Sequence, residues 1–317
     1  QAGGVKPMDQ QLTPESMAAL MEKVKTLGDP ARGELVFRRQ QLLCFSCHAI
    51  GDAGGVLGPN LVSIGASAPV DYLIESLITP SAKIKEGYHM VLVTKKDGSI
   101  VSGGLVQDGN DELVIRDPAN QIQKVAKSQV ASRTISPASM MPPGLTASLR
   151  EDEFIDLVSF LSKLGKEGEF KIAPNKYVRT WKTMGVMEQA DIDHVRHDGL
   201  PNLNDRNYKF PWGLTIAKVN GDLPLDELPA AAKMYPWFPK IGQFGLKLTA
   251  DGKVKLGINE TKGVIVVLDG EEVRDLKPQF ELNLKAGSHL VSVVVTRDAG
   301  DLKAVRVELL EGAAVVE

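Results

Sequence analysis

Both cysteines of this 317-residue chain lie in one short stretch, Cys44-Phe45-Ser46-Cys47-His48. Two thiols at this spacing lie about one helical turn apart, and each can form a thioether with one vinyl group of a porphyrin. The histidine that follows directly can present its imidazole to the porphyrin iron. The order C-x-x-C-H is therefore the attachment signal for one covalently bound c-type haem. Cys44 and Cys47 are the expected anchors, and His48 is the expected iron ligand.

Two cysteines at this spacing also occur as a disulfide, as half of a zinc site or as a thioredoxin-like redox pair. A structural zinc site needs two more Cys or His ligands at close spacing, and the sequence has none nearby. A thioredoxin-like pair belongs in a βαβ unit, and the surrounding pattern lacks one. We therefore favour haem attachment over these alternatives.

An iron bound by His48 has either a second axial ligand or an open coordination position. A thioether ligand raises the reduction potential and suits electron transfer, whereas an open position suits peroxidase-type or gas chemistry. Met141 is our candidate for the second ligand, because it stands before a rigid Pro-Pro-Gly stretch and shortly before a predicted helix. Met140 is its nearest competitor, and His89 or Met90 is a further alternative.

The elements that must position these residues follow from apolar periodicity and turn signals. Period-two alternation around the turn at residues 96–99 predicts a small antiparallel β insertion at about residues 88–127. Helical periodicity with capping signals predicts four helices before and after it, at about residues 13–27, 31–41, 70–78 and 148–164.

From about residue 171 the pattern changes to regularly spaced short strands separated by turns such as Asp251-Gly252. This arrangement is typical of an all-β sandwich. The aromatic segment 234–239 and Trp212 are candidates for stacking on sugar rings, although such residues also plug the end of a sandwich. Residues 191–198 carry two histidines and several acids, which suit either a metal-binding loop or a solvated polar loop.

Residues on both sides of the C-x-x-C-H motif resemble a class I c-type cytochrome domain. Gly33 and Phe37 precede the motif, Gly58-Pro59-Asn60-Leu61 follows it, and a Met-Pro pair precedes the helix Asp156–Leu161. The variant with a β-rich insertion is similar to the haem-binding domain of planctomycete and verrucomicrobial proteins. The resemblance covers about residues 28–164. Further matching stretches are Gly28–Gly33, Thr79–Ser81, Gly87–Tyr88 and Ser139–Pro142.

The resemblance implies roles for single residues. In such cytochromes a loop proline carbonyl, here that of Pro59, accepts a hydrogen bond from the ring of the iron-binding histidine, here His48. The methionine before proline is the sixth iron ligand, which favours Met141 over Met140. The helix that carries Gly33 is expected to cross the last helix of the domain.

The fold expected from these patterns is multidomain. An N-terminal arm and helix occupy residues 1–27, and a mainly-α cytochrome c fold with its β insertion at 88–127 occupies residues 28–167. An all-β sandwich-like domain follows at residues 168–317. A chain of this length has room for two such cores.

Composition limits the function classes. With 43% hydrophobic residues, 24% charged residues and a net charge of −3, the chain offers no argument for a nucleic-acid partner. No apolar run reaches the length of a membrane span. The start Gln1-Ala2-Gly3-Gly4 is typical of a processed chain, and haem c is attached outside the cytoplasm. We therefore expect an exported, periplasmic or secreted protein.

The expected function is that of a mono-haem c-type cytochrome, an electron-transfer protein rather than an enzyme. By family analogy, the electrons come from a dehydrogenase partner, such as a sugar dehydrogenase. Two alternatives stay open at this stage. One is a haem enzyme or sensor with an open distal position, as in a peroxidase. The other is a protein that binds polysaccharide or another partner through its β domain.

Overall fold

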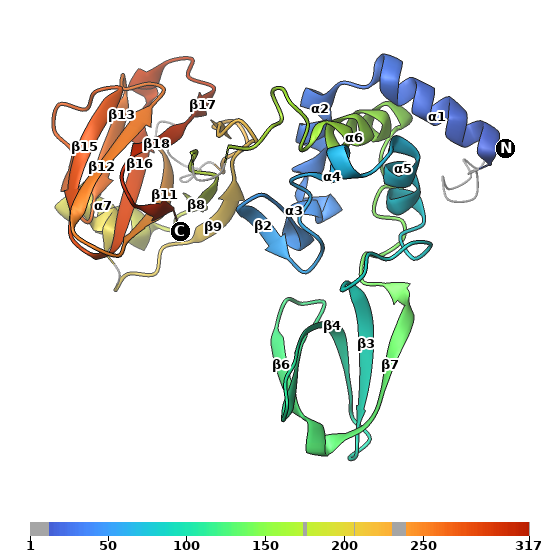
Figure 1. Ribbon diagram of the computed structural model, residues 1–317. Coiled ribbons are helices and arrows are strands. Elements are labelled where there is room, and N and C mark those ends of the chain that lie inside the picture. The colour runs from blue at the N-terminus through green and yellow to red at the C-terminus, as the bar shows by residue number, and fades with distance from the viewer. Residues whose placement is uncertain (1–12, 174–175, 206, 230–238, 317) are drawn as a thin grey trace. The chain divides into compact units, whose positions relative to one another are not determined.

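The computed structural model describes residues 13–173, 176–205, 207–229 and 239–316 of the chain. Its contacts divide the chain into two compact units, Gln1–Ile172 and Ala173–Glu317 (Figure 1). The boundary lies a few residues beyond the position expected from the sequence, between residues 167 and 168. Within the described ranges, no helix combines the length and the apolar character that crossing a bilayer requires.

Helices of the first unit begin where the sequence carries capping signals. The Thr13 hydroxyl accepts a hydrogen bond from Ser16 N, and the Asp29 carboxylate accepts from the backbone N–H groups of Ala31 and Arg32. Each of these helices starts with a proline, which has no N–H to leave unpaired. The helices of this unit are α1 (Pro14–Leu27), α2 (Pro30–Phe37), α3 (Cys44–Cys47), α4 (Ile64–Ser67), α5 (Val70–Ile78) and α6 (Glu151–Lys163).

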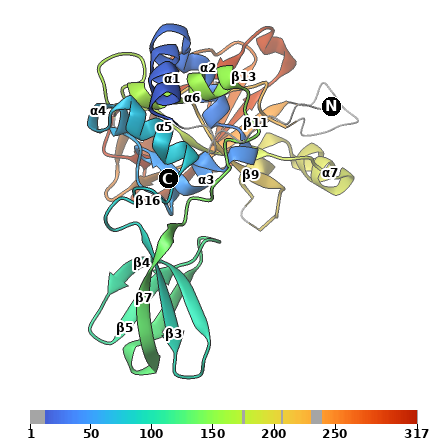
Figure 2. The same ribbon diagram turned by 90° about the vertical axis from the view of Figure 1, so that its right-hand side faces the viewer.

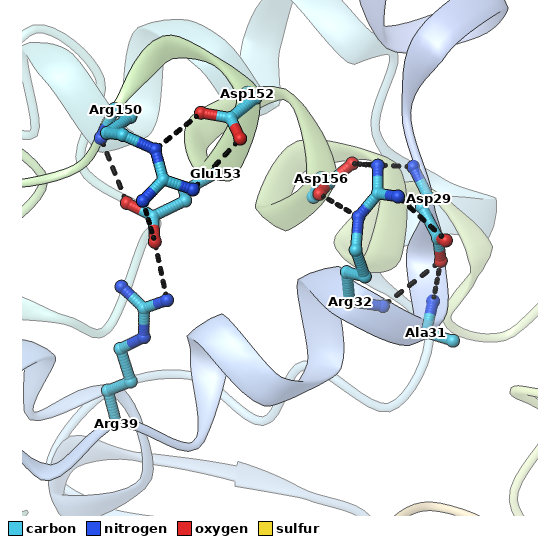
Figure 3. A network of polar contacts seen from close by, with 8 residues as sticks. All are labelled: Asp29, Ala31, Arg32, Arg39, Arg150, Asp152, Glu153 and Asp156. Atoms are coloured by element: carbon cyan, nitrogen blue, oxygen red, sulfur yellow. Dashed lines mark hydrogen bonds and ion pairs between the residues drawn. The ribbon is translucent and has the colours of Figure 1, made fainter.

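Helices α2 and α6 cross closely because Gly33 has no side chain. A Cβ atom at this position would lie 1.9 Å from the carbonyl oxygen of Asp156. The Asp156 residue is 3% exposed, and its carboxylate accepts bonds from Asp29 N (2.7 Å) and from the Arg32 guanidinium (2.8 and 3.1 Å) (Figure 3). The same end of α6 is tied to the segment after α2, where Arg39 donates to Glu153 at 2.6 Å. These contacts fix the helix that leads toward the C-x-x-C-H motif.

Between α5 and α6 the chain forms a five-stranded antiparallel sheet with its own apolar core (Figure 2). The strand order is β6-β5-β4-β3-β7, and the core consists of Val91, Val93, Val101, Leu113, Ile115 and Val125. Strand β7 extends the sheet past residue 127, where the sequence placed its end, because β7 pairs with β3 although most of its side chains are exposed. The strands are β3 (His89–Lys95), β4 (Ile100–Asp108), β5 (Glu112–Arg116), β6 (Ile122–Ala126) and β7 (Val130–Ser139).

The expectation of a mainly-α cytochrome c fold in the first half of the chain is wrong. Strands account for 36% of the structure and helices for 25%. Besides the five-stranded sheet, the first unit has a separate hairpin of β1 (His48–Ile50) and β2 (Ala53–Val56). The physical reason is that alternating apolar residues between α5 and α6 build an independent sheet, whereas glycine and proline keep several helices to one or two turns. The first unit is therefore a mixed α and β structure.

The second unit contains the expected sandwich-like sheets. Its larger sheet has the order β14-β13-β16-β11-β8-β9, with β19 paired to β11, and its smaller sheet has the order β15-β12-β18. Apolar side chains from both sheets form one core, which includes Phe244, Leu256 and Leu282. The strands are β8 (Thr180–Met184), β9 (Trp212–Ile216), β10 (Leu223–Pro224), β11 (Lys240–Leu248), β12 (Gly252–Ile258), β13 (Val264–Leu268), β14 (Glu271–Glu272), β15 (Gln279–Leu284), β16 (Gly287–Val295), β17 (Ala304–Val305), β18 (Val307–Glu311) and β19 (Val315–Val316).

Helix α7 (Gln189–Asp198) and a short 3-10 helix at Leu200–Asn204 cover the other face of the larger sheet. Ile192 and Val195 of α7 pack with Ile241 and Val294 of the sheet. The polar segment 191–198 is thus mostly the outer part of a packing helix.

Candidate functional site

The C-x-x-C-H motif forms a single helical turn that ends in a strand. Leu43 adopts the left-handed conformation (φ 55°), which turns the chain into α3. Cys44 and Cys47 lie at the two ends of this helix, three residues apart and hence on one side of it. Both are free thiols, and His48 opens β1 directly after them. The turn therefore presents both thiols and the imidazole as one group.

Burial sets the protonation of the two thiols. It raises the pKa of Cys44 to about 12 and raises the pKa of Cys47 as well. A thioredoxin-like pair needs the opposite shift, because the thiolate is the nucleophile in that chemistry. The surroundings of these thiols thus fit a buried attachment point better than a redox-active dithiol.

The His48 ring is oriented by the backbone of the following loop. Its Nδ1 lies 2.8 Å from the carbonyl oxygen of Pro59. A carbonyl oxygen can only accept, so Nδ1 carries the proton and Nε2 keeps its lone pair. Burial lowers the pKa of His48, an effect that the bond to Pro59 partly opposes. The neutral ring with a free Nε2 lone pair is the form that binds a metal ion.

Gly58 makes this orientation sterically feasible. A Cβ atom on Gly58 would lie 2.5 Å from Cε1 and 2.7 Å from Nδ1 of the His48 ring. Gly58 N also donates to the carbonyl of Cys47 at 2.7 Å. The loop is closed on its outer side by Asn60, whose side-chain amide bonds both N and O of Gly51 (3.0 and 2.7 Å). The Gly-Pro-Asn sequence therefore builds a rigid support for the imidazole.

The motif opens into a cavity of about 330 Å³ in the first unit. This volume lies at the lower end of the range for small-molecule and cofactor sites. The cavity is lined by Cys44, Cys47 and His48 of the motif and by Pro59 of the following loop. Met141, which lies much later in the sequence, lines it as well. Apolar residues form most of the remaining wall, among them Phe37, Leu42, Leu57, Leu61, Ile64, Leu73, Leu77, Ile84, Leu145, Leu157 and Leu161. A flat, largely apolar ligand suits such a wall.

Both candidate methionines lie on this cavity, just after β7. Ser139 orders their segment, because its N–H donates to the Ser81 hydroxyl (3.1 Å) and its own hydroxyl accepts from Met141 N (3.1 Å). The Met140 side chain lies against the β4 backbone, with Cε 3.1 Å from where a Cβ of Gly104 would stand. Met140 thus contacts β4 as well as lining the cavity.

The alternative ligands His89 and Met90 lie elsewhere. Both are half-buried in β3, and neither is among the described residues that line the cavity. Across the described part of the chain, no three His, Cys, Asp or Glu side chains are grouped so that they could hold a metal ion. The site thus contains the motif and the two methionines that the sequence singled out.

Polar residues of the cavity wall were not anticipated as site residues. Tyr72 comes from α5, and Lys83, Lys85 and Tyr88 come from the segment between α5 and β3. Tyr88 belongs to a stretch that matches the resembled family, but neither lysine is part of a recognisable motif. Only the folded chain shows that they reach the same cavity as the cysteines.

In the second unit, the described side chains that the sequence suggested for sugar or metal binding pack against other residues of the fold. Trp212 is half-buried and packs against Phe210 at a ring distance of 6.1 Å. Residues 234–238 of the aromatic segment lie outside the described residues. His194 of α7 stacks on Tyr208 (4.0 Å between ring centroids), and the side chain of His197 is outside the described part. Trp212 thus contributes to the packing beneath α7.

Comparison with known proteins identifies no family for this chain. No family model matches the sequence, and a search of curated proteins finds no match. Among solved structures, a family 35 carbohydrate binding module from an environmental isolate aligns with a TM-score of 0.22 at 13% identity, covering 25% of this chain and 72% of the module. A likeness at this level does not define the fold.

Proposed function

We propose that the chain is a mono-haem c-type cytochrome that carries single electrons. The observation that supports this most strongly is a single cavity lined by Cys44, Cys47, His48 and Met141, residues that lie almost a hundred positions apart. Two thiols beside an apolar cavity suit a porphyrin held by thioethers. When bound there, haem supplies a one-electron iron couple.

Each residue of the site has a distinct task in this proposal. Cys44 and Cys47 would hold the porphyrin covalently, and His48 would present Nε2 to its iron. Pro59 fixes the ring and its tautomer through the bond to Nδ1, as outer partners of metal-bound histidines do. The apolar wall would limit the access of solvent to the cofactor and so tune its redox potential.

Met141 would supply the second protein ligand of the iron. Its backbone is held by Ser139, while Met140 packs against Gly104. A thioether ligand would close the coordination sphere and raise the potential, which suits electron transfer rather than substrate turnover. In the alternative, a haem enzyme with an open site, Met141 would not bind the iron and the second coordination position would be free.

Spectroscopy of the exported protein distinguishes these alternatives. We expect a low-spin spectrum with the weak sulfur-to-iron band near its red end, which Met141→Ala abolishes. Met140→Ala is the matched control, and it should keep the band because Met140 packs on β4. Survival of the band in Met141→Ala would overturn the ligand assignment. A high-spin resting spectrum of the unaltered protein would favour a peroxidase-like enzyme.

The proposal also places the protein in the cell. Because haem c is attached outside the cytoplasm, the functional protein is periplasmic or secreted. Its partner is a redox protein that donates electrons, and a dehydrogenase acting on a small substrate such as a sugar fits that role by analogy.

A further inference from the structure

The charged side chains on the cavity wall are all of one sign. Lys83 and Lys85 are the charged residues among the described residues that line it, and neither Asp nor Glu contributes. An apolar cavity with cationic groups and without carboxylates is suited to a flat ligand that carries negative charge. The charge of the cavity wall thus favours an anionic ligand, and its apolar surface favours a flat one.

The two lysines differ in their partners. Lys83 Nζ lies 2.7 Å from a carboxylate oxygen of Glu75, and this ion pair raises its pKa. For Lys85, the contact the structure shows is with an aromatic ring, with Nζ 5.9 Å from the centroid of Tyr88. Among the described residues, no carboxylate lies within ion-pair distance of Lys85. Its charge is therefore available to a ligand, whereas that of Lys83 is already balanced.

A tight turn brings Lys85 and Tyr88 together. Tyr88 N donates to the Lys85 carbonyl at 3.0 Å, and Gly87 within the turn has φ +83°. The left-handed backbone conformation at this position favours glycine. Ser81, earlier in the same segment, bonds to Ser139 beside the methionines. The segment is thus anchored to the rest of the site, and its turn places Lys85 and Tyr88 together on the cavity wall.

We propose that Lys85, assisted by Tyr88, binds a carboxylate of the ligand and is a positioning residue of this site. The inference rests on the proposed function, because haem carries two propionate carboxylates on an otherwise apolar ring. An ammonium beside one of them offsets its negative charge. Loss of that ammonium leaves the carboxylate uncompensated and so stabilises the more positive, oxidised iron.

The test compares midpoint potentials of the exported holoprotein at low ionic strength, where charge effects are least screened. In Lys85→Gln, we expect the ratio of reduced to oxidised protein at a fixed applied potential to fall by about threefold. Lys85→Arg keeps the charge and should restore the ratio. Lys96→Gln is the matched control, since Lys96 is exposed on the β3–β4 turn and does not line the cavity.

Each outcome decides the inference. An unchanged visible spectrum with a lowered potential in Lys85→Gln alone supports it, because a merely structural role would alter the spectrum or leave the potential as it was. Equal shifts in Lys85→Gln and Lys96→Gln would overturn it and leave the proposed function intact. If the unaltered protein carries no covalent haem, the proposed function fails and the inference fails with it.

Discussion

The imidazole of His48 is oriented by a backbone carbonyl and not by a carboxylate. Burial favours the neutral ring, and the bond from Nδ1 to Pro59 fixes the tautomer that leaves the Nε2 lone pair available. This bond requires the loop to run directly over the ring, and that approach is feasible only because residue 58 is glycine. The function of one histidine thus depends on the missing side chain of a neighbour.

Gly58→Ala tests this dependence. A Cβ atom 2.5 Å from the ring must displace either the imidazole or the loop, so we expect a loss of about 1–3 kcal/mol in the free energy of unfolding and a weakened low-spin spectrum. Gly213→Ala is the control, because its Cβ would meet only a backbone oxygen 3.9 Å away. Denaturant unfolding followed by circular dichroism measures the stability of both variants, and the visible spectrum reports the site around His48. Equal, small effects in the two variants would show that the ring does not rely on Gly58.

Single residues of the site were predictable from sequence to different degrees. The attachment motif was predictable because Cys44, Cys47 and His48 lie within five consecutive positions, and this spacing alone predicts haem attachment. Met141 was predictable only through its local Met-Pro context, which by itself does not separate it from Met140. Lys85 belongs to no motif, and the role we propose for it depends on a turn that places it on a cavity built by other elements.

At the scale of elements, the crossing of α2 and α6 positions the segment that carries the motif. Asp156 lies at the centre of this crossing, where its buried carboxylate accepts bonds from one backbone N–H and from Arg32. Removing the carboxylate would leave the N–H of Asp29 without its partner in a partly buried place, which is costly.

We expect Asp156→Ala to lower the free energy of unfolding of the first unit by about 2–3 kcal/mol. Asp152→Ala is the matched control, because Asp152 is exposed and bonds only its neighbour Arg150 among the contacts drawn in Figure 3. Its loss should lower the free energy of unfolding far less than the loss of Asp156, because an exposed ion pair is screened by solvent. Thermal unfolding monitored by circular dichroism measures both variants. A cost for Asp152→Ala as large as that for Asp156→Ala would contradict this account of the crossing.

The sheet between α5 and α6 shows where element prediction failed. Its existence followed from the alternation of apolar residues in β3 to β6, and these residues do form its core. Strand β7 was missed because long-range pairing with β3 holds it in place, although its own side chains are mostly exposed and include Pro137. With β7 included, strands form a large part of the first unit beside its helices, so the mainly-α expectation fails.

At the scale of the whole molecule, the chain has two units with separate cores. Phe154 is fully buried in the first unit, and Phe244 is 2% exposed in the core of the second. Two cores of this kind predict two unfolding transitions rather than one. The change from helical periodicity to regular short strands indicated this division in the sequence.

Calorimetry of the full chain tests the division. Phe154→Ala and Phe244→Ala each remove a buried aromatic side chain, at a cost of about 3–5 kcal/mol. We expect each variant to lower the midpoint of one transition and to leave the other unchanged. A single transition that both variants shift equally would contradict the two-unit description.

The most direct measurement of the central claim is the intact mass of the protein after export from a host that matures c-type cytochromes. We predict that the chain is heavier than its sequence by one haem, and that a Cys44→Ala, Cys47→Ala double variant has the mass of the bare polypeptide. A wild-type mass that matches the bare polypeptide under the same conditions would contradict the account.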